Sequence, residues 1–274
     1  MPDTYAPSDY AEDPLLAHLL GQSVMALPAV TAAICISSVA ENDDGDSIVE
    51  PPGTYARLAV SPAGGLEGAG GDMTLSPSLV FAPPSEAYSV AGVALVDAPS
   101  GGNVLAYCNL GSVIAAAVDN LIVIGGGQLV LGFTSNSPMT NQCRLKMLRL
   151  LLGKSSFSIV QRYIAVTSTT PTRTSTGSSL AEPAAVNGYA RLAVAAGDWA
   201  VPSFGVSSNA NPLVFGPATP GAWFSGGSPA AVAALVDDSV AGSLYVWAPI
   251  VVPQSIYINQ TLTFDTTKLT IGLR

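Results

Sequence analysis

A hexapeptide that occurs twice constrains this chain more than any other feature. The segment Tyr-Ala-Arg-Leu-Ala-Val occupies residues 55–60 and returns unchanged at residues 189–194. Three further segments recur in the same order, at residues 79–81 and 213–215, 94–97 and 234–237, and 128–133 and 268–273. The offset is 134 residues for the first two pairs and 140 for the last two, so the copies differ by small loop insertions. The sequence therefore predicts a tandem duplication of one domain-sized unit.

A short helical pattern opens each copy. Asp13 suits an N-cap, Pro14 suits the first helical position, and Gly21 suits the residue beyond the helix end. The second copy repeats the pattern, with Asn141 as the cap and Gly153 as the stop. We therefore expect a first domain at residues 1–133, a linker at 134–140 and a second domain at 141–274.

After each helix the apolar residues form short or alternating runs between clusters of Gly, Pro, Ser, Asn and Asp, which is typical of strands. The predicted strands are residues 29–36, 55–60, 75–81, 90–96, 104–110, 117–124 and 128–133, then 163–167, 189–194, 212–215, 230–236, 243–250, 255–264 and 268–273. Glycines 125–127 lie between two of these runs and predict a hairpin turn. The expected fold is all-β: two tandem β-sandwich, jelly-roll-like domains, each preceded by a short α-helix.

The composition favours a protein that is covered by neighbours. Hydrophobic residues make up 49% of the chain and charged residues 11%, which is low for an exposed surface. No window of 18 uninterrupted apolar residues exists, so we expect no membrane partner. The first residues have neither the basic nor the apolar region of a secretory signal. Burial of surface in an assembly is the better interpretation.

Charge is unevenly distributed between the two copies. Residues 1–143 contain one basic and fourteen acidic residues, whereas residues 144–274 contain nine basic and five acidic ones. Five of the basic residues lie in one stretch: Arg144, Lys146, Arg149, Lys154 and Arg162. This stretch is either a solvated helix face or a contact surface for an acidic partner, such as the first domain of another copy. With a net charge of −9, nucleic acid is not an expected partner.

No residue pattern indicates catalysis, a cofactor or a metal. His18 is the single histidine, and the second copy has no counterpart to it. Cys35, Cys108 and Cys143 lack metal-ligand spacing and are predicted to be buried free thiols. The acidic loop at residues 41–46 lacks the glutamate of an EF-hand and is predicted to be solvated. We therefore expect no catalytic, cofactor-binding or metal-binding residues, and no enzyme.

Six charged residues recur between the copies and are interpreted as structural. They are Glu50, Arg57 and Asp97 in the first copy and Glu182, Arg191 and Asp237 in the second. Each carboxylate is expected to tie a turn or to offset the charge of the strand arginine. Replacing either arginine with alanine should lower the melting temperature.

The order of these segments resembles a widespread family of tailed-bacteriophage virion proteins, which includes tail-fibre-like and other structural proteins. The strongest matches are Gly-Tyr-Ala-Arg at residues 188–191 and Ala-Leu-Val-Asp at 94–97, followed by Gly101 and Gly102. The resemblance covers residues 13–133 and 141–273. It departs from the family pattern at Thr54, where glycine is usual, and at Asn259, which stands where the first copy has Asp119.

The resemblance implies a non-enzymatic structural protein, made in the host bacterial cytoplasm and carried on the virion. We expect a capsid decoration (cement) protein on the capsid exterior, with the major capsid protein and other copies of itself as partners, and a trimer as the favoured oligomer. The absence of a long coiled-coil stretch and the low charge content favour this role. A tail-fibre or tail-adaptor component is the alternative.

A carbohydrate-binding adhesion module is a further alternative, with host surface glycan as the ligand. Trp199, Trp223 and Trp247 all lie in the second copy and could offer faces on which sugars stack. The competing interpretation places these three side chains in the core or in an oligomer interface.

Overall fold

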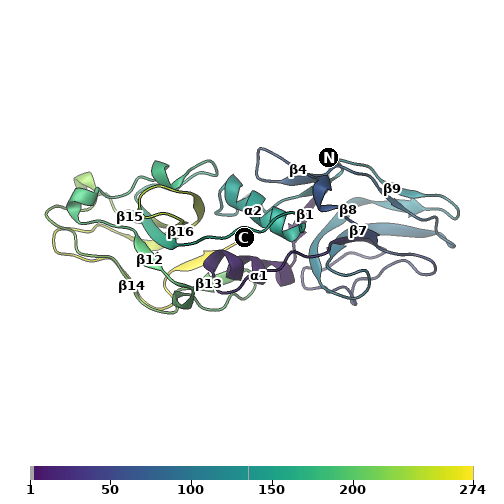
Figure 1. The fold of residues 1–274 in the computed structure, drawn as a ribbon, viewed down its shortest axis with the longest axis horizontal. Coiled ribbons are helices and arrows are strands. Elements are labelled where there is room, and N and C mark those ends of the chain that lie inside the picture. Colours follow the sequence, from purple (N-terminus) through teal and green to yellow (C-terminus); the bar gives the residue numbers. More distant parts are fainter. Residues whose placement is uncertain (1–2, 135, 274) are drawn as a thin grey trace. The chain divides into compact units, whose positions relative to one another are not determined.

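The computed structural model describes residues 3–134 and 136–273, and it is dominated by β-strands (Figure 1). Two α-helices occur among these residues, α1 (Asp9–Leu20) and α2 (Asn141–Leu151). Short 3-10 turns are η1 (Pro62–Gly64), η2 (Gly177–Ser179), η3 (Ala185–Asn187), η4 (Ala196–Asp198) and η5 (Ser225–Gly227). The predicted all-β class is confirmed, while the jelly-roll strand order stays a prediction. No helix in the described ranges is long and apolar enough to cross a membrane.

The chain divides into two compact units, each assembled from separate segments of the sequence. Unit 1 comprises Met1–Leu15, Met25–Ser135 and Arg144–Phe157. Unit 2 comprises Leu16–Val24, Asn136–Cys143 and Ser158–Arg274. The predicted domain limits at residues 133 and 141 describe the sequence repeats, and they stay a prediction.

Unit 1 is built on one extended set of paired strands. Their order is β3 (Leu58–Ala59), β2 (Thr31–Cys35), β7 (Tyr88–Val96), β8 (Val104–Ala116), β1 (Asp3–Pro7), β10 (Leu129–Leu131), β5 (Met73–Leu75) and β4 (Gly65–Glu67). A separate pair joins β6 (Leu79–Phe81) to β9 (Ile122–Ile124). Strands β1 and β10 are parallel, and the other pairs are antiparallel. Figure 1 shows the long neighbouring strands β7 and β8 side by side.

Unit 2 repeats the first four strands of this order. A four-stranded sheet has the order β12 (Leu192–Val194), β11 (Arg162–Thr167), β15 (Ala230–Val236) and β16 (Leu244–Gln254). Two further pairs join β13 (Val206–Ser208) to β18 (Thr270–Gly272) and β14 (Leu213–Val214) to β17 (Thr263–Phe264). The cores of the two units correspond: β2 and β7 supply Ala33 and Ala94 in unit 1, as β11 and β15 supply Ala165 and Ala234 in unit 2. Removal of these apolar side chains from water is the main favourable contribution to each fold.

Both helices begin earlier than the sequence predicts. Helix α1 starts at Asp9, where the Ser8 hydroxyl accepts a hydrogen bond from the Ala11 amide at 3.3 Å, so Pro14 lies inside the helix and Asp13 is not its cap. In α2 the capping side chain is Thr140, whose hydroxyl accepts from the Cys143 amide at 3.2 Å. The local rule for proline placed the start of α1 wrongly, because a serine further upstream was available as a cap.

The predicted strand over the hexapeptide and the predicted hairpin at residues 125–127 both need correction. Only residues 58–59 and 192–194 of the two hexapeptides pair as strands, and the tyrosine and arginine that precede them do not. The Gln128 amide does close a turn on the Gly125 carbonyl at 3.2 Å. However, β9 pairs with β6 whereas β10 pairs with β1 and β5, so this turn connects two sheets instead of forming a hairpin.

Candidate functional site

Arg57 lies in a set of contacts that joins three loops of unit 1. Its Nε and Nη2 donate to the Glu50 carboxylate at 3.0 and 2.7 Å. Nη1 donates to the carbonyls of Ala98 and Gly101 at 3.0 and 2.6 Å, and Nη2 also donates to the Gly45 carbonyl at 2.6 Å. We call such a set, an arginine with its glutamate and three carbonyls, an arginine clamp. The Arg57 side chain is only 2% exposed, so the clamp is internal.

Unit 2 contains the same clamp around Arg191. Its Nη2 donates to Glu182 at 2.6 Å and to the Gly177 carbonyl at 2.6 Å. Its Nη1 donates to the carbonyls of Asp238 and Ala241 at 2.7 and 2.6 Å. A planar guanidinium satisfies this fork of acceptors, which a lysine ammonium would not match.

The repeated aspartates lie at turns and not beside the arginines. Asp97 accepts from the amide and the side chain of Asn103 at 2.7 and 2.9 Å. Asp237 accepts from the Ser243 amide at 2.6 Å and from the Tyr245 hydroxyl at 2.9 Å. The six repeated charges thus divide by type: each glutamate binds an arginine, and each aspartate ties the turn after its strand.

The tyrosine of each hexapeptide is fixed by the neighbouring strand. The Tyr55 hydroxyl accepts from the Ile34 amide at 2.9 Å, and the Tyr189 hydroxyl accepts from the Val166 amide at 3.0 Å. Tyr189 also donates to Glu182 at 2.6 Å. Burial, and secondly the nearby glutamate, raises the pKa of both phenols, so they stay protonated. The tyrosine and arginine repeated in the two hexapeptides therefore hold loops and strands together.

Two glycines that sequence reasoning missed complete the clamps. A Cβ at Gly45 would lie 1.9 Å from the Gly101 carbonyl oxygen, and one at Gly177 would lie 2.1 Å from that of Ala241. The backbones approach so closely that only glycine fits. A signal was present, because each glycine stands five residues before the glutamate of its clamp.

The three cysteines are buried thiols that form no disulfide, as predicted. Burial, with a further contribution from Glu50, raises the pKa of Cys35 to about 12. Since the thiolate is the reactive form, we expect all three thiols of the native protein to resist iodoacetamide at pH 8 and to react after unfolding in guanidinium. Mass spectrometry counts the modified cysteines. Rapid labelling of Cys35 in the folded protein would contradict this assignment.

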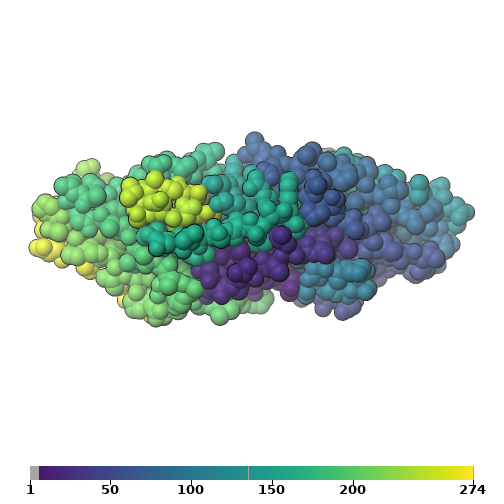
Figure 2. Space-filling model, in the orientation of Figure 1, coloured from purple at the N-terminus to yellow at the C-terminus, as the bar shows by residue number. Residues whose placement is uncertain are grey.

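The residues of the predicted basic cluster form ion pairs and hydrogen bonds with other residues of the same chain. Arg149 pairs with Glu67 at 2.6 Å, and Lys154 lies 3.6 Å from the same carboxylate and donates to the Gly65 carbonyl at 2.8 Å. The hydrogen bond from Arg149 is the main cause that lowers the pKa of Glu67. In Figure 2, blue atoms of the first sequence repeat lie beside the teal atoms of the middle of the chain, where this ion pair joins β4 to α2.

The other members of the cluster also have intramolecular contacts. Arg144 is buried and donates to the Phe133 carbonyl. The Lys146 ammonium lies 5.9 Å from the centre of the Phe157 ring. Arg162 donates to the Leu19 carbonyl at 2.6 Å. These side chains therefore do not form one free basic surface.

The three tryptophans are buried within the described structure. Trp199, Trp223 and Trp247 are 3%, 1% and 9% exposed. Trp223 packs edge-on against the rings of Tyr189 and Phe215, with centroids 5.3 and 5.9 Å apart. In this structure they offer no open ring face on which a sugar could stack.

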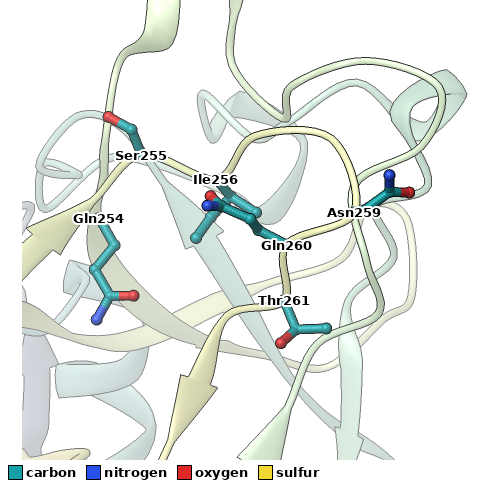
Figure 3. A pocket seen from close by; sticks show the side chains of 6 residues that line it. All are labelled: Gln254, Ser255, Ile256, Asn259, Gln260 and Thr261. Carbon is teal, nitrogen blue, oxygen red and sulfur yellow. The ribbon is translucent and has the colours of Figure 1, made fainter.

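A polar pocket of about 590 Å³ lies in unit 2 where β16 ends (Figure 3). Its lining consists of Gln254, Ser255, Ile256, Asn259, Gln260 and Thr261. Gln254 is the last residue of β16, and the others belong to the loop that leads to β17. None of the six side chains carries a charge.

No metal centre is apparent in the described ranges, where no group of three or more His, Cys, Asp or Glu side chains could hold an ion. In the acidic loop, Asp44 instead accepts from the amides of Asp46 and Ser47 at 3.1 and 2.8 Å. These hydrogen bonds lower the pKa of Asp44, and those from Ser47 contribute most. His18 is buried on α1.

Comparison with known proteins identifies the family. The model of the family described as podophage GP4 fiber I protein gp80 matches residues 6–132 and, a second time, residues 138–272. The chain belongs to this family. The predicted phage structural protein with a tandem duplication is thereby confirmed. A search of curated proteins found no match.

Proposed function

We propose that this member of the fiber I family is a non-enzymatic component of a podophage fibre, carried on the virion. The observation that carries the proposal is the double match to a family whose description names a fibre protein. The arginine clamps agree with it, since their polar groups are bound to one another and hold loops in place. Such internal contacts serve a rigid structural part.

Capsid decoration is the second candidate, and the low charge content of 11% supports it because a cement protein is largely covered by neighbours. Cryo-electron microscopy of virions that carry this protein with an added small tag distinguishes the two roles. We expect tag density on fibres at the tail. Density at threefold or twofold positions of the shell would overturn the fibre assignment and favour cement against the major capsid protein.

An apolar face of unit 1 supports self-association. Val80 and Val123 lie directly opposite each other on β6 and β9 and are 46% and 52% exposed. Leu121, two residues before Val123, is 59% exposed. In the second repeat, Thr263 stands at the position of Val123, and Thr261 stands at the position of Leu121. We propose that another copy of the chain covers this face, in a homo-oligomer for which a trimer is favoured.

The double variant Leu121→Thr with Val123→Thr is expected to weaken self-association at least tenfold. Each change removes apolar area worth roughly 1 kcal/mol or more in an interface, and about 1.4 kcal/mol is tenfold in affinity. The variant introduces the residues found in the second repeat, so it should remain folded. Sedimentation velocity over a concentration series measures the effect.

Val214→Thr, which changes the counterpart of Val80 in unit 2, is the matched control and should assemble like the wild type. A monomeric wild-type protein, or unchanged assembly in the double variant, would refute this contact.

A further inference from the structure

We propose that the polar pocket at the end of β16 binds a neutral saccharide unit. It is a largely open pocket with a volume of about 590 Å³, which leaves room for a sugar ring. The lining offers three amides, two hydroxyls and one aliphatic side chain, and no charge. This assignment adds a ligand to the proposed fibre role and applies equally if the protein lies elsewhere on the virion.

The duplication provides an internal comparison for this pocket, because the first repeat forms the same turn. Asp119 and Asn259 are equivalent, and both have φ of 64°. The next amide closes the turn in both copies, from Asn120 to Ala117 at 3.2 Å and from Gln260 to Tyr257 at 2.9 Å. The backbone conformation therefore does not depend on the side chains that surround it.

Four side chains in or beside the pocket are more polar than their counterparts in the first repeat. Gln254, Ser255, Tyr257 and Thr261 stand where the first repeat has Ile114, Ala115, Ala117 and Leu121. Since the turn forms with the apolar set in the first repeat, the turn itself does not require the polar set. Ser255 has a structural partner, since its hydroxyl donates to the Gly227 carbonyl at 2.6 Å. Gln254 and Thr261 have no such partner among the described residues, so these two side chains supply hydrogen-bonding groups that are available to a ligand.

The available groups match the hydroxyls of a sugar. Within the described residues, the side chains of Gln254 and Thr261 form no hydrogen bond. The Gln260 carbonyl oxygen accepts from the Tyr257 amide at 3.0 Å, which leaves its NH₂ group to donate. Amides and hydroxyls supply donors and acceptors together, as a sugar hydroxyl requires.

Two further observations favour a neutral saccharide over other polar ligands. No lysine or arginine lines the pocket, so a phosphate or carboxylate group would find no opposite charge there. The ring of Tyr257, in the same loop, is 55% exposed and presents an apolar face beside polar groups. Aromatic rings of this kind combine apolar contact with a polar edge.

The test uses the full chain and a panel of neutral sugars: glucose, galactose, mannose, rhamnose, N-acetylglucosamine and their neutral disaccharides. We expect at least one to cause saturable NMR shifts at the backbone amides of residues 254–261. In the variant Gln254→Ile with Thr261→Leu, the affinity should fall at least tenfold. The melting temperature should not change, because the first repeat carries these residues at the same positions.

Ile114→Gln, the exchange at the equivalent position of unit 1, is the matched control and should bind as the wild type does. Absence of saturable shifts with every sugar would overturn the proposal, as would undiminished affinity in the double variant. Tighter binding of glucuronic acid than of any neutral sugar would overturn the ligand class. None of these outcomes affects the virion imaging, which tests the fibre role separately.

Discussion

Arg191→Ala is expected to destabilise unit 2 by about 3–5 kcal/mol, because removing one member of a buried ion pair leaves its partner uncompensated. Glu182 is 16% exposed and would lose the guanidinium that it contacts at 2.6 Å. The carbonyls of Gly177, Asp238 and Ala241 would lose their donor in the same step.

Urea unfolding followed by circular dichroism measures this loss. Arg191→Lys should retain part of the stability, since an ammonium reaches the carboxylate without matching the fork of carbonyls. Lys268→Ala, which removes an exposed positive charge from the same unit, is the control and should change stability by less than about 0.5 kcal/mol. A loss as small in Arg191→Ala as in this control would show that the loops do not depend on the clamp.

Gly45→Ala is expected to destabilise unit 1 by about 3 kcal/mol, at the upper end of what overpacking costs. The new Cβ would lie 1.9 Å from the Gly101 carbonyl oxygen, so one of the two loops must move. Movement would break the hydrogen bond from the Gly45 amide to Gly102, now 2.8 Å, and the one from Arg57 to the Gly45 carbonyl. Thermal unfolding should show a lower melting temperature.

Gly111→Ala is the matched control in the same unit. Nothing lies within 4 Å of a Cβ at Gly111, and its φ is not positive. This variant should be as stable as the wild type or slightly more stable, because alanine restricts the unfolded chain. Equal stability of Gly45→Ala and Gly111→Ala would mean that the loop contact is not as close as described.

The sequence shows which charged residues repeat between the copies, but it does not show which groups they contact. Glu50 and Arg57 are seven residues apart, so their pairing was within reach of local reasoning. The carbonyls of Ala98 and Gly101 are 41 and 44 residues from Arg57 in the sequence. No sequence pattern predicts which backbone carbonyl accepts a hydrogen bond at that separation. Likewise, Arg149 meets Glu67 across 82 residues, a pairing that only packing creates.

The sequence alone determined the duplication, the all-β class and the family, because repeats and alternating apolar residues are local properties of the chain. The tertiary structure decided which side chains face solvent. It buried the three tryptophans and left Tyr257 exposed beside an uncharged pocket. Burial depends on contacts between residues far apart in the chain. The two copies therefore share a backbone turn yet present different surfaces, apolar at Leu121 and polar at Thr261.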